Sequence, residues 1–165
     1  MTGTRRSAAG TLAALAVLSA VASAAPAHAQ PPGFPDASAA KEVPADKYRH
    51  PSPDPTDQND IFFDTVDGVS CLIGETTMCS GELPGLPDQP GCPAVTQADI
   101  NAPYRFVWMP GPCIAPGYDV LNPGEQVTNS PVNVTCIAEA NRLLGCIDTV
   151  HFHGFVLQPS GSFVF

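Results

Sequence analysis

Basic residues are scarce in this chain of 165 residues, which has 7 Lys and Arg against 16 Asp and Glu and a formal net charge of −9 at pH 7. Phosphate backbones and anionic lipid surfaces repel a protein of this charge, so we expect no nucleic-acid partner. Charged residues make up only 14% of the chain, whereas there are 19 Pro and 14 Gly. This composition excludes a coiled coil and a helical bundle.

The motifs of several enzyme classes are also missing. The chain has no Cys-x-x-Cys, no His-Glu-x-x-His and no glycine-rich phosphate loop. Its nearest approach to a hydrolase nucleophile elbow is the segment 68–72, Gly-Val-Ser-Cys-Leu, where Leu72 replaces the second glycine. We therefore predict a protein without enzymatic activity and without a cofactor.

The N-terminus has the three parts of a secretory signal peptide. Arg5 and Arg6 form a positive start, an uncharged run rich in Ala, Leu and Val covers 8–25, and Ala-His-Ala at 27–29 is a cleavage site. A second site of this type ends at Ala24, and the sequence does not choose between them. The alternative is a membrane anchor, but an apolar run of about 18 residues rich in alanine is at the lower limit for spanning a bilayer.

We predict a signal peptide over residues 1–29 and a protein that is secreted or associated with the cell envelope. Removal of Arg5 and Arg6 would change the net charge from −9 to −11. No membrane insertion is expected after this removal, and we expect a monomer.

Residues 30–59 are rich in proline, with seven prolines and only three large apolar residues, Phe34, Val43 and Tyr48. Proline fixes φ and lacks the N–H donor, which opposes both a helix and a strand ladder. The few apolar side chains repay little of the entropy lost on ordering. We predict a disordered linker; a stalk or a docking segment for a partner is the alternative.

Residues 60–165 make up the predicted folded domain. Short runs rich in β-branched and aromatic residues alternate with Gly, Pro, Asn and Asp, a pattern typical of an all-β protein. We predict a small disulfide-bridged antiparallel sandwich or open barrel. The expected strands cover 61–66, 69–73, 76–80, 104–109, 118–121, 126–128, 132–138, 143–149, 154–157 and 162–165.

Two connections also have local signals. Thr96 and Asp99 resemble a helix capping box, which predicts a short helical turn over 96–102. The segment Gln-Pro-Ser-Gly at 158–161 predicts the turn of a C-terminal hairpin.

An aromatic stripe lies in the predicted strand 104–109, because a period of two places Tyr104, Phe106 and Trp108 on one face. Such a stripe can bind a sugar or a peptide. The inner face of a sheet is the plainer interpretation, and we favour it.

The six cysteines are an even set, which is expected to pair in an oxidising compartment, and six thiols allow 15 pairings. They are predicted to be structural disulfide residues rather than catalytic ones. Their positions are Cys71, Cys79, Cys92, Cys113, Cys136 and Cys146.

Spacing favours two local pairs among these cysteines. Opposition of Cys71 and Cys79 in a hairpin would leave a three-residue loop at 74–76, and opposition of Cys136 and Cys146 would leave one at 140–142. A direct cross-strand pair has the short separation that a disulfide needs. Cys92 and Cys113 are then partners by elimination.

Three segments resemble recurring signatures of small secreted, cysteine-paired proteins of actinobacteria. The resemblance covers residues 61–80 and 119–165 and departs over 83–103, which is longer and richer in proline. It implies a secreted β-domain, and it transfers no catalytic residue because the family has no assigned activity. The segments are 63–71 (Phe-Asp-Thr-Val-Asp-Gly-Val-Ser-Cys), 121–125 (Leu-Asn-Pro-Gly-Glu) and 153–157 (His-Gly-Phe-Val-Leu).

His151 and His153 are two residues apart, so on a strand they share a face and could supply two ligands to zinc or copper beside Asp148. A sheet-edge role for one histidine and exposure of the other is the plainer interpretation. Ser160 and Ser162 are close enough in sequence to suggest a small hydrolase, although nothing marks this as more than coincidence.

The function favoured by the sequence is a non-catalytic binding or interaction module of the bacterial cell envelope or exterior. Its partner would be an unidentified protein or envelope component that contacts the loops. The alternative is a secreted protease inhibitor that presents the disulfide-flanked loop 109–116 around Cys113, with Ile114 as its contact residue. A hydrolase or metal binder using His151 and His153 is the third hypothesis.

Overall fold

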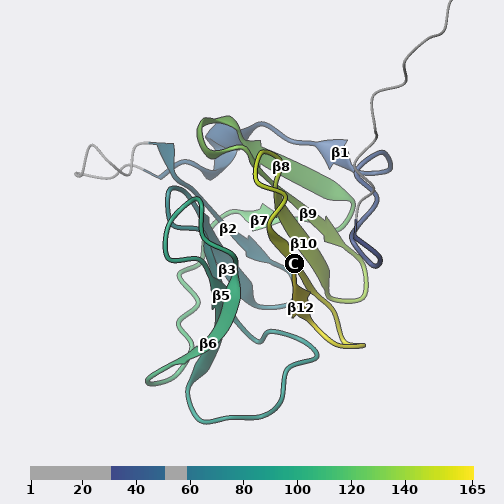
Figure 1. Cartoon of the computed structure of the whole chain (residues 1–165). Helices are drawn as coiled ribbons and strands as arrows, with labels where there is room; N and C mark the ends of the chain where they lie inside the picture. Colours follow the sequence, from purple (N-terminus) through teal and green to yellow (C-terminus); the bar gives the residue numbers. More distant parts are fainter. Residues whose placement is uncertain (1–30, 51–58) are drawn as a thin grey trace, which may run out of the picture.

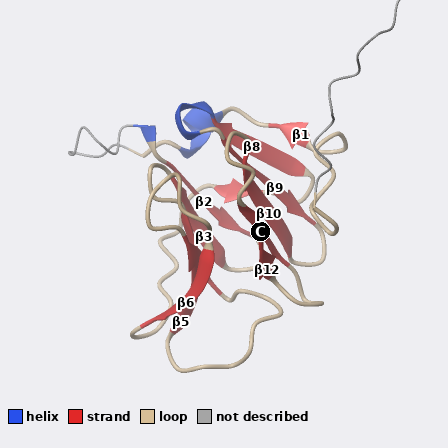
Figure 2. Cartoon of the chain, in the orientation of Figure 1, coloured by secondary structure: helices blue, strands red, loops and turns tan. Residues whose placement is uncertain are grey.

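Strands with alternating burial form two six-stranded sheets that pack face to face (Figures 1 and 2). The structure is a computed structural model that describes residues 31–50 and 59–165. The predicted all-β fold is confirmed, and of the two predicted architectures it is the sandwich rather than the open barrel. The predicted signal peptide and the linker residues 51–58 lie outside the described residues.

Sheet A has the strand order β1-β8-β9-β10-β11-β12, and β1 is its one parallel member. Its strands are β1 (Lys41–Glu42), β8 (Glu125–Asn129), β9 (Val134–Glu139), β10 (Leu143–Asp148), β11 (Gly154–Leu157) and β12 (Phe163–Val164).

Sheet B has the order β6-β5-β4-β3-β2-β7, in which β7 pairs in parallel with β2. Its strands are β2 (Ile61–Thr65), β3 (Val69–Ile73), β4 (Met78–Gly81), β5 (Cys92–Thr96), β6 (Arg105–Met109) and β7 (Val120–Leu121).

The core lies between the inner faces of the two sheets. In β2, Ile61 and Phe63 are fully buried, whereas Phe62 between them points to the outer face and is half-buried. Phe155 of β11 contributes from sheet A, and Tyr104 packs on it with ring centroids 5.1 Å apart. The sequence pattern of period two therefore gives each sheet one inner and one outer row of side chains.

The prediction of a disordered linker is wrong for residues 31–50. β1 pairs with β8, and η1 (Ala45–Tyr48) is a 3-10 helix that places Tyr48 in the core at 0% exposure. Val43 is also buried, and its N–H donates to the Gln126 carbonyl at 2.8 Å. The three large apolar residues of this segment are too few to form a core of their own. Each of them instead packs against the sheets of the β-domain.

The outer face of sheet A is covered by the same segment. Ile137, Gly145 and Val156 form one cross-strand row, and the side chains of Phe34 and Pro35 lie over its glycine. Ile137 and Val156 are both fully buried although they face away from the inter-sheet core. The folded unit therefore begins well before residue 60.

Two strands, β1 and β5, were not predicted, and the predicted helical turn over 96–102 was wrong. β5 contains Pro93, a residue that is rare within sheets; Pro93 pairs with Trp108 on β6, while the β4 ladder ends at Ala94 and does not reach it. Residues 99–102 form a turn closed by the Ala102 N–H on the Asp99 carbonyl rather than a helix. No helix in the described ranges is long and apolar enough to span a bilayer.

The three disulfides join the predicted pairs: Cys71 with Cys79, Cys92 with Cys113 and Cys136 with Cys146. The first and third link directly opposed residues of hairpins, with Cα atoms 4.1 Å apart. The second hairpin has the expected loop 140–142, in which Asn141 has a positive φ of 64°, whereas the first loop covers 74–77, one residue more than expected. The disulfides fit an extracellular protein, since such bonds persist in oxidising compartments.

Candidate functional site

The outer face of sheet B, like that of sheet A, is covered by an irregular segment. Here, however, a cavity remains between the segment and the sheet. Leu72 of β3 and Met78 of β4 are cross-strand neighbours on this face, as are Ser70 and Ser80. Phe62 extends the apolar row on β2, opposite Leu72. These side chains form an apolar floor that contains one pair of hydroxyl groups.

The roof is the segment 110–118, which follows β6 and runs along the outside of sheet B toward β7 (Figure 1). Its sequence, Pro-Gly-Pro-Cys-Ile-Ala-Pro-Gly-Tyr, excludes a regular strand. The Cys92–Cys113 disulfide joins its middle to β5. Its end is held where the Tyr118 N–H donates to the Asp64 carboxylate at 2.9 Å.

Between floor and roof lies a cavity of about 420 Å³, which we call the outer cavity. Ligand sites in proteins typically have volumes of about 300–1,000 Å³. Its thirteen lining residues include no charged side chain. Met78 and Met109 supply flexible, polarisable thioethers that can adapt to a ligand. This chemistry suits an apolar ligand.

Three aromatic rings close one end of the floor. Phe62 and Tyr118 have ring centroids 5.2 Å apart, and His50 lies 4.9 Å from Tyr118 and 5.8 Å from Phe62. His50 comes from the segment predicted to be a linker. Its Nε2 atom is buried without a hydrogen-bond partner. The N-terminal segment thus contributes to the edge of the cavity as well as to sheet A.

The loop proposed for protease inhibition forms this roof. Ile114 is 78% exposed, and it also lines the outer cavity. An apolar side chain beside a disulfide and between prolines is held in a restricted conformation at low entropic cost. The geometry therefore agrees with either use of the loop, as a roof or as a presented contact.

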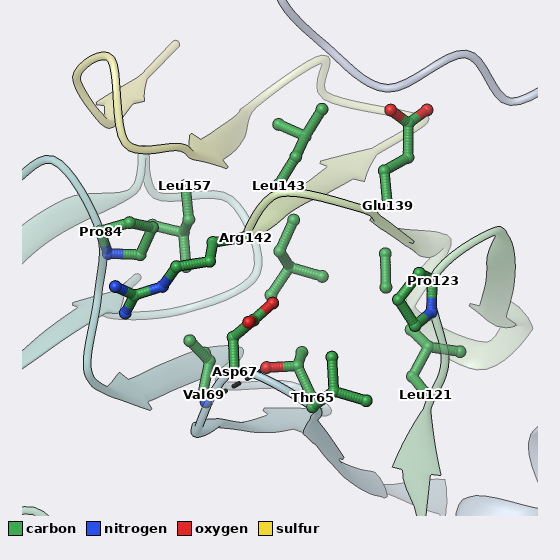
Figure 3. A pocket seen from close by; sticks show the side chains of 13 residues that line it. Thr65, Asp67, Val69, Pro84, Leu121, Pro123, Glu139, Arg142, Leu143 and Leu157 are labelled. Atoms are coloured by element: carbon green, nitrogen blue, oxygen red, sulfur yellow. Dashed lines mark hydrogen bonds between the residues drawn. The ribbon is translucent and has the colours of Figure 1, made fainter.

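A second recess, at one end of the sandwich, is too small for a ligand. Figure 3 shows its lining, with Asp67 from the β2–β3 turn and Arg142 from the β9–β10 turn near the leucines of the sheet ends. Its volume is about 10 Å³, close to the minimum for one water molecule. We assign it no binding role.

The predicted histidine site has a different arrangement from the one expected. His151 Nδ1 lies 2.7 Å from Asp148 Oδ2, and the Asp148 side chain is 1% exposed. Asp148 Oδ1 accepts the backbone N–H groups of Val150 and His151. Asp148 therefore stabilises the turn after β10, and both of its oxygens are engaged within that turn.

His153 does not join the pair. Its ring is stacked near that of His151 with centroids 6.4 Å apart, and its Nδ1 is buried without a hydrogen-bond partner. In residues 31–50 and 59–165, no three His, Cys, Asp or Glu side chains come together as a metal site.

The serines suggested for a hydrolase lie elsewhere. The Ser162 hydroxyl donates to the Pro84 carbonyl and accepts the Gln158 N–H, at the opposite end of the β11–β12 hairpin from His153. Ser160 belongs to the turn of the same hairpin. The Ser–His–Asp constellation is not assembled, because strand pairing separates residues that are close in sequence.

The Asp148 end of the sandwich is polar inside. Tyr104 is 3% exposed, and burial raises its pKa to about 12, against a smaller opposing effect of Thr77. Gln97 is 2% exposed, and neither of its amide atoms has a hydrogen-bond partner within the described residues. Such groups lower stability because each loses its hydration without compensation.

Two of the three residues of the predicted aromatic stripe lie in or against the core, as an inner-face position requires. Tyr104 is in the core and Phe106 packs against it, as favoured. Trp108, however, lies outside this cluster and lines a separate hollow. The outer cavity itself was not predicted, because its floor comes from β2, β3 and β4 and its roof from a segment some forty residues later.

Comparisons with known proteins add no relative. The chain matches no protein-family model, no curated protein and no solved structure.

Proposed function

We propose that this chain is a secreted, non-catalytic binding module of the bacterial cell envelope or exterior, which holds an apolar ligand in the outer cavity. The observation that carries the proposal is a cavity of about 420 Å³ with no charged side chain in its lining. The disulfides, the signal-peptide pattern and the resemblance to secreted actinobacterial proteins support the location. We further propose that the module acts as a monomer.

Burial of apolar surface supplies the affinity. Transfer of a CH₂ group from water to an apolar site contributes about 0.8 kcal/mol, so about ten buried CH₂ groups supply about 8 kcal/mol before the cost of association is subtracted. The paired hydroxyls of Ser70 and Ser80 lie in the floor, where they can hydrogen-bond one polar group of the ligand. A charged ligand would find no counter-charge in this lining.

The test uses the neutral dye Nile red, whose fluorescence rises in apolar surroundings. The oxidised protein is expected to bind it with one site, and a long-chain alcohol is expected to displace it. Leu72→Glu places a carboxylate in the floor and should weaken binding by about tenfold or more, since an unpaired charge in an apolar site is costly.

The matched control is Val164→Glu, which adds the same charge on β12 at a residue that is 36% exposed and outside the cavity. It should bind the dye as the parent does. Equal binding by Leu72→Glu, or no binding by the parent, would contradict the proposal. Analytical ultracentrifugation of the parent protein tests the proposal that it is a monomer.

The exposure of Ile114 favours protease inhibition as a second candidate. An inhibitor would block a secreted serine or cysteine protease in a panel assay and lose potency in Ile114→Ala, while Val66→Ala, a substitution at another exposed apolar residue, would not matter. Loss of dye binding in Ile114→Ala without any protease inhibition by the parent supports the ligand module instead.

A further inference from the structure

The two faces of β6 face two different hollows. Met109 lines the outer cavity, whereas its neighbour Trp108 points to the opposite face and lines a second hollow of about 420 Å³, which we call the Trp108 hollow. The other wall of this hollow is the β4–β5 connection, residues 82–91, and Arg142 reaches it from the β9–β10 turn.

Core packing does not account for the position of Trp108. It is the only tryptophan of the chain, yet it is half-buried and lies outside the core cluster that holds Tyr104 and Phe106 from the same stripe. Within residues 31–50 and 59–165, no other aromatic ring contacts it. A large ring left at an open hollow has apolar area available for a ligand.

The remaining lining combines leucines and prolines with polar side chains that carry both hydrogen-bond donors and acceptors. Glu82 and Asp88 supply carboxylates, Gln89 an amide and Arg142 a guanidinium. The Arg142 Nη2 atom donates to the Glu82 carbonyl at 2.7 Å and lies 3.8 Å from Glu82 Oε2. Because a guanidinium has five N–H donors, these contacts fix its position and leave other donors for a ligand.

Several of the walls are held in place before any ligand arrives. A Cβ atom at Gly91 would lie 2.4 Å from the Met109 carbonyl, so the end of the β4–β5 connection packs directly on β6. Cys113, which also lines the hollow, is fixed to Cys92 by its disulfide. Preorganised walls reduce the entropy lost on binding.

We propose that the Trp108 hollow is a second binding site of this protein and that it takes a neutral saccharide. A pyranose ring presents a face of C–H groups, which pack on the electron-rich face of an indole. Its hydroxyls each donate and accept, and they match a lining that contains carboxylates, an amide and a guanidinium together. An apolar ligand would leave these groups desolvated and unpaired.

The site lies apart from the outer cavity, so it does not depend on the proposed function. A ligand in one hollow and a ligand in the other would contact opposite faces of β6. The expected protein therefore binds an apolar molecule and a glycan at the same time.

The test exploits Trp108 as the single tryptophan. The full oxidised protein is titrated with four neutral hexasaccharides of glucose, xylose, mannose and N-acetylglucosamine, all β-1,4-linked, while the indole emission and its quenching by acrylamide are recorded. At least one sugar is expected to shift the emission to shorter wavelength and to protect the ring from acrylamide. No change with any of the four up to their solubility limits overturns the proposal.

Substitutions at Trp108 remove the fluorescent indole, so the binding of the sugar to these variants is measured by calorimetry. The affinities of the variants then locate the site. Trp108→Ala should weaken binding by about tenfold or more, the range found when a stacking ring is removed, and Trp108→Phe should restore part of it. The matched control is Met109→Ala, on the next residue but the opposite face, which should bind the sugar as the parent does. Undiminished binding by a folded Trp108→Ala protein overturns the assignment.

A cationic ligand is the competing outcome, since Glu82 and Asp88 beside an indole could also hold an ammonium group. Tetramethylammonium and sugar are compared in low and high salt. Salt screens a cation from the carboxylates but leaves a neutral sugar little affected. Binding of the cation alone, lost in salt and in the Asp88→Asn protein, overturns the saccharide proposal.

Discussion

The Nδ1 atom of His151 lies 2.7 Å from Oδ2 of Asp148, a carboxylate whose side chain is 1% exposed. Three donors of the turn converge on this carboxylate, and Phe152 completes the turn with a positive φ of 58° and an N–H that donates to the Asp148 carbonyl. His151 was predicted to act with His153 in a metal or hydrolase site, but its contact with Asp148 instead closes a turn.

Asp148→Asn is expected to destabilise the protein by about 1–3 kcal/mol at neutral pH, because buried donors lose a charged acceptor. Burial alone would raise the pKa of Asp148, but the hydrogen bonds from His151 and Val150 outweigh it and lower the pKa. The stability that the ionised carboxylate contributes is complete above its ordinary pKa and is lost as the pH falls through the lowered value.

Urea unfolding across the acid range measures this effect. The variant should show a flatter decline of stability with falling pH than the parent. Glu75→Gln, at an exposed loop residue, serves as the control and should follow the parent curve. Parallel acid curves for Asp148→Asn and the parent would show that the turn does not depend on the charge.

Because Tyr104 is buried, we expect the protein to lose stability at alkaline pH. Burial raises its pKa to about 12 from an ordinary value of 10.0. The phenol is neutral in the fold, so its contribution is complete below the unfolded pKa and is lost as the pH rises through the folded value, a change of about 2–3 kcal/mol.

Tyr104→Phe keeps the ring against Phe155 and removes the titration. Its stability should fall less steeply on the alkaline side than that of the parent, measured by brief exposure to urea at each pH. Tyr118→Phe is the comparison, since that ring lies on the outer face of sheet B. A parent curve with no alkaline decline would contradict burial of a neutral Tyr104.

Removal of the Cys92–Cys113 disulfide is expected to affect the outer cavity specifically. The bond spans a sequence separation of 21, and its loss should cost about 3 kcal/mol. Since this bond fixes the roof to β5, Cys92→Ser with Cys113→Ser should also weaken Nile red binding several-fold.

The control replaces Cys136 and Cys146, which are buried in sheet A away from the cavity. This variant should lose a comparable amount of stability while it retains dye affinity at a temperature where it is folded. Equal dye affinity in both variants would indicate that the roof is held by other contacts. Denatured but unreduced parent protein should show no titratable thiol.

Gly145 is expected to fix the N-terminal segment on sheet A. An added Cβ would lie 2.4 Å from Cδ of Pro35, so Gly145→Ala should displace that proline and cost about 1–3 kcal/mol. Proteolysis within residues 31–40 should accelerate.

Pro35→Ala in the Gly145→Ala background provides the double-mutant test, because it removes the ring that the new methyl group meets. The double variant should be more stable than additivity predicts. Strict additivity would contradict direct packing of Pro35 on this glycine.

Local patterns in the sequence were sufficient for most strands and for the disulfides. Residues 69–73 and 154–157 form the strands that were expected, and the spacing of Cys71 and Cys79 gave the hairpin register, because a cross-strand pair around a short loop is decided by nearest neighbours in the chain. The alternation in 104–109 likewise separated Trp108 from Met109.

The composition of a segment gave wrong predictions where that segment is stabilised by contacts with residues distant in the sequence. Tyr48 and Val43 belong to a proline-rich segment that could not fold alone, and β5 contains a proline that its partners tolerate. Their burial depends on surfaces contributed by other parts of the chain. Average properties of a segment carry no information about such surfaces.

By itself, the sequence determined the all-β class, the hairpins and their two cross-strand disulfides, since these follow from contacts between residues close in the chain. Only the tertiary structure decided where the folded unit begins, that Asp148 serves a turn, and that β6 separates an apolar cavity from a polar hollow. Cavities are spaces between segments, and the packing of whole sheets and loops sets their size and lining.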